Sequence, residues 1–171
     1  MQKIGQFPSL AALNLYDVKK YSGILDKPKF QELTKAIGLA AHGVGVGSFV
    51  YLRRIFEMLV EEAHQLARSP EAWIETGEKL DEEEFNKARM AEKIQLLHKH
   101  LPSFLVENRS LYGILSKGVH ELSEQECLAA FPIVRIGIEI ILDAKVEQLS
   151  RMKKQEAARK AIQALAENRA W

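Results

Sequence analysis

Residues 49–63, FVYLRRIFEMLVEEA, decide the fold class of this chain. Apolar side chains recur there every three or four positions, which is the period of one face of an α-helix. Arg53 and Glu57 lie one turn apart on another face as an i,i+4 ion pair. Ser48, a residue type that caps helices, precedes the stretch, so we expect a helix from Ser48 to Leu66. Its apolar face comprises Phe49, Leu52, Ile55, Phe56, Leu59 and Val60.

The same periodicity extends on both sides of this stretch, whereas strand signals are almost absent. We expect one helix over about 9–22 and another from Lys27 to a break at His42-Gly43. Ser69-Pro70-Glu71 signals a further start, because proline is well suited to the first helical position.

The second half of the chain predicts three more helices. A capping box at Asp81 opens a helix that continues over 81–101. A shorter helix is expected over 104–117, with Gly118 as its left-handed C-terminal residue. Ser123 begins a capping box for the last helix, in which Pro132 either introduces a kink or marks a new start.

Two charged segments flank this region. Residues 71–86 hold seven carboxylates against one lysine, which is typical of a solvated linker or outer face. Residues 144–171 hold seven Lys or Arg and three Glu, and predict a polar, projecting helix. This tail has two open interpretations: it lies along RNA, DNA or an acidic partner, or it is a solvated or coiled-coil-like helix.

These patterns predict an all-α protein, an up-down bundle of about five to six helices with a projecting C-terminal helix. We divide the chain into an N-terminal helical arm (1–26), a helical bundle (27–148) and a charged helical tail (149–171).

Composition narrows the functional classes. A net charge of +1 gives no global attraction to nucleic acid or anionic lipid. Cys127 is the only cysteine, so a disulfide within the chain and a cysteine-based zinc site are excluded, which favours a cytoplasmic protein. No uncharged apolar run of 18 residues is present, so we expect no membrane span.

Residues 42–48, HGVGVGS, raise the question of a phosphate site. Glycines before a helix let backbone N–H groups approach an anion. The hydrophobic strand and the lysine that accompany such loops are missing, so we favour a bend or a close helix contact. Ligand sensing by this stretch remains an alternative.

The segment 108–127, NRSLYGILSKGVHELSEQEC, holds the candidate chemistry. His120 beside a carboxylate is a candidate general acid or base, because free histidine titrates near neutrality. Arg109 and Lys117 are candidate phosphate holders. The alternative is that His120 only hydrogen-bonds its own loop. The side chains expected around a bound substrate are Arg53, Arg54, Glu57, Asn108, Tyr112 and Glu121.

Metal and thiol chemistry have weaker signals. His98 and His100 are two positions apart, so their side chains diverge on a helix, and no metal or other cofactor is expected. Cys127 lies in the first turn of a helix, which stabilises a thiolate, but packing with Leu122 as a hydrophobic staple is favoured.

The order of three motifs resembles the HEPN superfamily (higher eukaryotes and prokaryotes nucleotide-binding domains), especially its uncharacterised bacterial branch. The motifs are FVYLRRIFEMLVEEA, then, after the acidic segment, KIQLLHKHLPSFLVENRSLYGILSKGVHE, then AAFPIVRIGIEIILD, and the resemblance covers roughly residues 30–145. It implies a bundle of about four to five helices that pairs as a homodimer.

The resemblance also implies a choice between two functions. Many members are metal-independent ribonucleases of toxin–antitoxin, CRISPR or phage-defence systems, with an arginine and a histidine about four to six residues apart at the dimer interface. His120 stands where that histidine would stand, but ten residues separate it from Arg109. Other members have lost the motif and serve as interaction modules.

We therefore expect a non-catalytic dimerisation or interaction module of a bacterial stress or phage-defence protein. The alternative is a ribonuclease with a composite site around His120. The expected partners are a second copy and an RNA or a protein.

Overall fold

The computed structural model describes residues 16–167 of the chain, and within that range it is helical with no strand. The predicted all-α class is therefore confirmed. The elements are η1 (Lys19–Gly23, a 3₁₀ helix), α2 (Lys27–Ala41), α3 (Gly45–Ala67), α4 (Pro70–Thr76), α5 (Glu82–Lys87), α6 (Met90–Leu96), α7 (Ser103–Glu107), α8 (Ser110–His120) and α9 (Glu124–Glu167).

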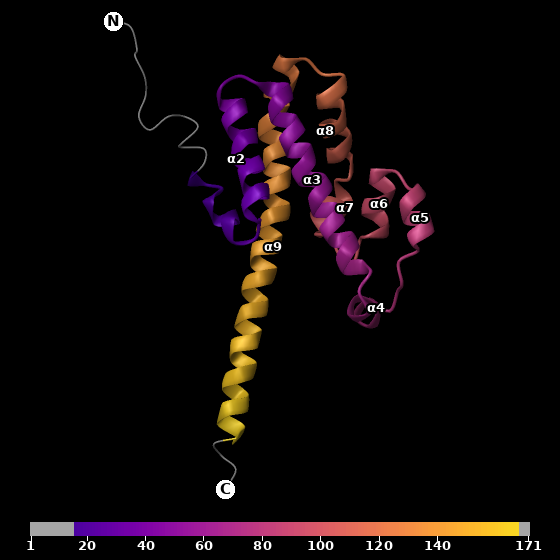
Figure 1. Ribbon diagram of the computed structural model, residues 1–171, viewed down its shortest axis with the longest axis vertical. Helices are drawn as coiled ribbons and strands as arrows, with labels where there is room; N and C mark the ends of the chain where they lie inside the picture. The colour runs from indigo at the N-terminus through magenta and orange to yellow at the C-terminus, as the bar shows by residue number, and fades with distance from the viewer. Residues whose placement is uncertain (1–15, 168–171) are drawn as a thin grey trace, which may run out of the picture.

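The bundle is built around α3. Figure 1 shows α2, α3, α8 and the first half of α9 side by side, with α4 to α7 gathered at the far end of α3. The predicted apolar face of the 49–63 stretch is buried between these helices, from Phe49 to Val60. Burying each such side chain stabilises the fold by about 1.5–3 kcal/mol. The core therefore lies on the face of α3 that the sequence predicts.

The segment before α2 packs on α9. Tyr21 is buried, and its O–H donates a 2.9 Å hydrogen bond to Asp143, which also pairs with Lys20 at 2.6 Å. Burial, followed by the hydrogen bond to Asp143, raises the pKa of Tyr21 to about 12. The predicted helix over 9–22 lies partly outside the described residues. Within them, the 3₁₀ helix Lys19–Gly23 replaces its last turn, so that part of the prediction is wrong.

The start of α3 corrects a second prediction. The break at His42-Gly43 is confirmed, since Gly43 has φ 79°. However, α3 begins at Gly45 after Val44, three residues before the predicted cap. Ser48 is buried within the first turn, and its hydroxyl donates to the carbonyl of Gly45 at 2.6 Å. The predicted cap is therefore wrong, because Ser48 lies inside a helix that has already begun at Gly45.

The acidic segment is more structured than a linker. Ser69 caps α4, accepting from the N–H of Ala72 at 3.1 Å, and Asp81 caps α5. The single helix expected over 81–101 is wrong, because the chain is extended at Arg89. There the carboxylate of Glu92 accepts the N–H of Arg89 at 2.6 Å and starts α6 as a new helix.

The helix expected over 104–117 is also divided. Asn108 closes α7 by donating from its side-chain amide to the carbonyl of Phe104 at 2.9 Å. A second helix, α8, then runs to His120 and includes Gly118, so the left-handed cap is wrong. A Cβ at Gly118 would overlap Cδ1 of Phe49 and lie 2.9 Å from Cγ, so glycine permits the close contact of α8 with α3.

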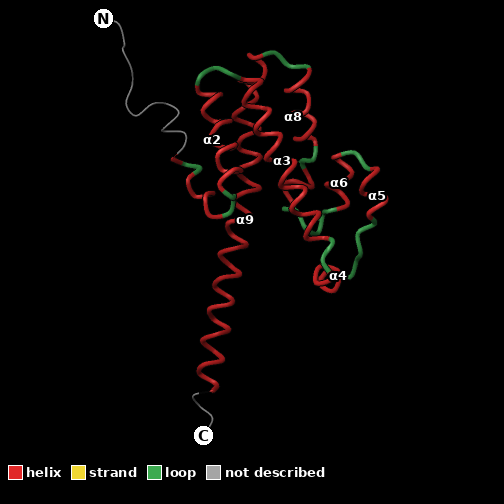
Figure 2. The backbone as a smooth tube through the Cα atoms, viewed as in Figure 1, coloured by secondary structure: helices red, strands yellow, loops and turns green. Residues whose placement is uncertain are grey.

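The last helix, α9, is continuous. The capping box at its start is confirmed, since the carboxylate of Glu126 accepts the N–H of Ser123 at 2.8 Å. Pro132 lies inside the helix, so a new start there is excluded. Residues 150–167, which we call the tail, are exposed throughout and project beyond the body (Figure 2). The predicted limit at 148–149 falls within this helix.

Candidate functional site

The candidate site lies where the end of α8 meets the middle of α3. His120 is exposed at the C-terminus of α8, and its Nε2 lies 3.3 Å from Nη1 of Arg53. A guanidinium can only donate, so this contact requires Nε2 to accept and the ring proton to lie on Nδ1. The contact therefore joins a donating guanidinium to an accepting ring nitrogen.

Arg53 is held in place by two neighbours. Its Nε donates to Oε1 of Glu57 at 2.8 Å, and the O–H of Tyr112 donates to the same oxygen at 2.9 Å. The guanidinium carbon lies 5.6 Å from the centre of the Tyr112 ring, within range of a cation–π contact. The ring of Tyr112 in turn packs against Phe56, with 5.6 Å between centroids.

These contacts fix the charges of the network. The hydrogen bond to Glu57 raises the pKa of Arg53, which stays cationic. Burial, and then the hydrogen bond to Glu57, raise the pKa of Tyr112, which stays neutral at physiological pH. The network therefore presents one guanidinium, partly neutralised by Glu57, next to His120.

The structure brings together only part of the predicted set. Lys117 is exposed one turn before His120 on the same helix, and Glu121 follows His120 as the exposed C-cap. Among the described residues, neither the Lys117 ammonium nor the Glu121 carboxylate has an ion-pair partner. Lys117 is thus the cation of the predicted set left available near His120.

Three predicted residues lie elsewhere. Arg109 is at the opposite end of α8, roughly 16 Å along the helix axis from His120, and donates to Gln95 at 3.1 Å. Arg54 points to α2, where it pairs with Glu32 at 3.0 Å. Asn108 is used to end α7. A phosphate group at His120 would therefore meet Arg53 and Lys117, and Arg109 is not placed to hold it.

A carboxylate of the protein itself occupies the position in front of the glycine stretch. The carboxylate of Glu124, from the start of α9, accepts the N–H groups of Gly45 and Val46, the latter at 3.0 Å. A Cβ at Gly45 would overlap the carbonyl oxygen of Glu124 and lie 2.9 Å from Cβ of Cys127. The glycine thus lets α3 approach α9 closely, and the position an anion would take is filled by a side chain of the protein.

Metal and thiol sites find no support in the described residues. Within residues 16–167, no group of three or more His, Cys, Asp or Glu side chains is arranged to hold a metal ion. Cys127 is buried, and its thiol donates to the carbonyl of Gly118 at 3.3 Å. Burial, and then the charges of Glu124 and Glu126, raise the pKa of Cys127, which makes it a poor nucleophile.

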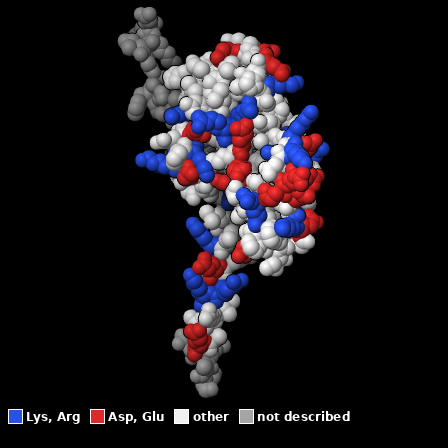
Figure 3. Space-filling view, turned by 45° about the vertical axis from the view of Figure 1, so that its right-hand side comes forward, with Lys and Arg blue, Asp and Glu red and all other residues white. Residues whose placement is uncertain are grey.

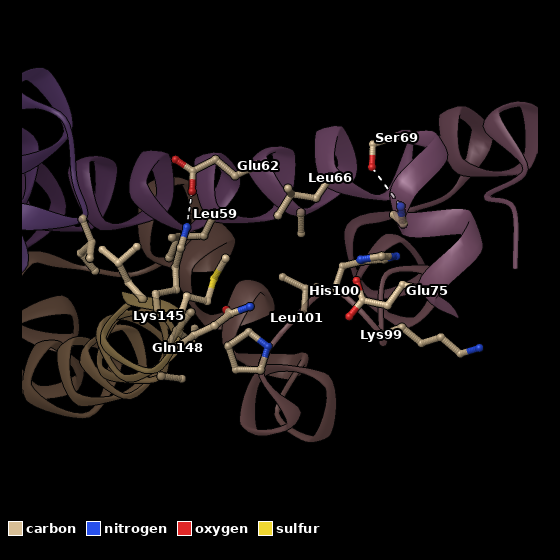
Figure 4. Close-up of a pocket in the computed structure, with 18 of the residues that line it drawn as sticks. Leu59, Glu62, Leu66, Ser69, Glu75, Lys99, His100, Leu101, Lys145 and Gln148 are labelled. Atoms are coloured by element: carbon tan, nitrogen blue, oxygen red, sulfur yellow. Dashed lines mark hydrogen bonds and ion pairs between the residues drawn. The ribbon is translucent and has the colours of Figure 1, made fainter. Parts of the chain in front are cut away.

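A groove of about 830 Å³, which sequence reasoning missed, lies between α3, α4 and α9. In Figure 4, Lys145 reaches from α9 to Glu62 at one end, and His100 and Glu75 lie at the other, with Leu66 and Leu101 between them. Burial raises the pKa of Glu62, but hydrogen bonds from Lys145 and Lys29 outweigh it, and the net pKa is lowered. Two apolar residues in polar surroundings could have indicated this groove in the sequence. They are Leu66 at the end of its helix and Met152 in the polar tail.

Comparisons with known proteins found no match to this chain among family models, curated proteins or solved structures. In the part of the chain that the structure describes, no helix combines the length and apolar character that crossing a bilayer requires.

Proposed function

We propose that this protein is a HEPN-like, non-catalytic assembly module of a bacterial stress or phage-defence protein, and that it pairs with a second copy of itself. The observation that carries the proposal is the tail. It is helical, all of its residues are exposed, and its large apolar side chains Met152, Ile162 and Leu165 are more than half exposed.

Physical reasoning favours a partner for such a segment. Most helical stability in proteins comes from packing of an apolar face, and the apolar side chains of the tail are left exposed. Two i,i+4 pairs support the tail, including Lys160–Glu156 at 2.6 Å, but such pairs contribute only about 0.2–0.5 kcal/mol each. Association with a partner would supply the missing burial.

The proposal is tested by sedimentation velocity on the full chain over a range of micromolar concentrations. We expect a species of twice the 19.4 kDa chain mass. Val50→Ser, which alters an exposed apolar side chain on α3 instead of α9, serves as a control and should leave the mass unchanged. A monomer at every concentration would overturn the proposal.

A second candidate, metal-independent RNA cleavage, is favoured by one observation, the contact between Arg53 and His120. In that function His120 would move a proton at the ribose or leaving oxygen, while Arg53 and Lys117 would hold the phosphate. Against it, Arg53 is already paired with Glu57. A cleavage assay without added metal should show background rates in both wild type and His120→Ala. Cleavage that requires His120 would instead establish the enzyme.

A further inference from the structure

We propose that the tail of each protomer lies in the groove of a second copy, so that the dimer is held by two reciprocal, antiparallel tail–groove contacts. This inference rests on the proposed self-association and adds which surfaces meet. The groove is the 830 Å³ cavity between α3, α4 and α9, and the tail is residues 150–167.

The groove is suited to an amphipathic helix. Its volume is in the range of sites that enclose several apolar side chains. Leu66 on α3 is 61% exposed and Met152 on α9 is 57% exposed, so its walls leave large apolar surfaces in contact with water. Grooves of this kind bind a helix through apolar residues three or four positions apart. Ile162 and Leu165 of the tail have that spacing and are 67% and 62% exposed.

The tail of the same chain cannot fill this groove. Leu149 and Met152 of α9 line it, and α9 continues without a break to Glu167. Residues beyond Met152 therefore point away from the body, as Figures 1 and 2 show. Returning into the groove would require breaking a continuous helix, so an occupant of this composition must come from another molecule.

Antiparallel pairing of two tails satisfies this geometry. If Ile162 of the second copy is level with Met152, then Leu165 of the second copy is level with Leu149, because both pairs are three positions apart. The two helices are then level at Ala157, the midpoint of this register. Each apolar end thus arrives at the groove of the opposite protomer.

Charge supports the same arrangement. Glu71 and Glu75 line the groove from α4, and among the described residues neither has an ion-pair partner. The tail holds five Lys or Arg, two of them (Arg159 and Lys160) within one turn of Ile162, against two Glu. Figure 3 shows both basic and acidic side chains along the projecting helix. A basic tail is therefore attracted to the groove of another copy.

A complementation experiment tests the inference. Leu66→Glu places a charge in the groove and leaves the tail intact, whereas Ile162→Glu alters the tail and leaves the groove intact. Each variant alone should weaken the dimer at least about tenfold, because both contacts are lost. Mixing the two should restore association in part, since the heterodimer keeps one intact tail in one intact groove. Both residues are exposed, so near-ultraviolet circular dichroism should show an intact core, whereas the helix content of the tail falls when the dimer is lost.

The outcomes separate this inference from the proposed function. A wild type that is monomeric overturns both. A dimer that persists in both variants, or that is not restored by mixing them, overturns only the tail–groove arrangement.

A cysteine pair gives a second readout. Met152→Cys and Ile162→Cys proteins, mixed and oxidised, should form a 152–162 disulfide that mass spectrometry identifies. Gln125→Cys, exposed at the far end of α9, mixed with Ile162→Cys measures collisional background. A yield no higher than this background contradicts the antiparallel arrangement.

Ile136→Glu alters an exposed residue on the body of α9. Loss of the dimer in this variant would assign the interface to the body of α9 and overturn the inference.

Discussion

Nη1 of Arg53 and Nε2 of His120 lie 3.3 Å apart although 67 positions separate the two residues in the chain. Their contact depends on Glu57, which orients the guanidinium, and on Tyr112, which is hydrogen-bonded to the same carboxylate oxygen. One oxygen of Glu57 thus accepts from both Arg53 on α3 and Tyr112 on α8, and this makes Glu57 the most sensitive position of the network.

Glu57→Gln should destabilise the protein by about 1 kcal/mol, because it weakens two hydrogen bonds to a charged, half-buried acceptor. Tyr112→Phe is the matched variant. It removes one of the bonds but keeps the ring on Phe56, so a loss of about 0.5 kcal/mol is expected. Urea unfolding measures the free energy of unfolding of both variants. A larger decrease for Tyr112→Phe than for Glu57→Gln would contradict the role of Glu57.

Gly118→Ala should destabilise the protein by about 2 kcal/mol or more, although alanine is the better helix former. The added Cβ overlaps the ring of Phe49, which is fully buried and has no space to move. Gly113→Ala on the same helix is the control, since nothing lies within 4 Å of its Cβ position. That variant should stabilise by about 0.5–1 kcal/mol. Thermal melts that rank the two in the opposite order would refute the packing argument.

Glu124→Ala should cost about 1–2 kcal/mol, because the first N–H groups of α3 lose their acceptor. Glu124→Gln keeps a neutral acceptor and should cost less.

The contact between Glu124 and the start of α3 also predicts that nucleotides give no thermal shift in wild type. A ligand at about 100 times its Kd would stabilise by about 2.7 kcal/mol, so a shift of that size would revive the ligand-sensing alternative.

Lowering the pH should reduce the free energy of unfolding, in part because Glu62 becomes protonated. Its pKa in the fold is below the ordinary value of 4.5, so its contribution to stability is present above about pH 4.5 and is lost as pH falls through the lower folded pKa. Glu62→Gln should therefore lower the free energy of unfolding at neutral pH and reduce its fall below pH 4.5. Identical acid profiles for wild type and Glu62→Gln would exclude this role.

Apolar periodicity and capping residues made the long helices predictable. The face of α3, the break at Gly43 and the caps at Ser69, Asp81 and Ser123 all follow from local chemistry, and each is present. The breaks that divide the later region into short helices were not predictable, because single side-chain bonds set them. Glu92 captures the N–H of Arg89, and Asn108 captures the carbonyl of Phe104, against a periodicity that would continue through both.

The candidate site was predictable only as a set of side chains. Its residue types are visible in the sequence, but the choice of arginine depends on how α8 packs on α3. Arg109 is the nearest arginine upstream of His120 in the chain, whereas Arg53 is the one in contact with it. That contact in turn depends on Gly118, which lets the two helices approach.

The contact of α3 with α9 has a consequence for synthesis on the ribosome. The apolar face of α3 and its capping carboxylate at Glu124 come from segments about 80 positions apart, since Glu124 bonds the N–H of Gly45. Phe49 also packs against Gly118 of α8, so this face emerges long before α8 and α9, two of the helices that pack on it, are made. Until α9 has been translated, the nascent chain exposes this surface, and that interval is when it is most prone to aggregate.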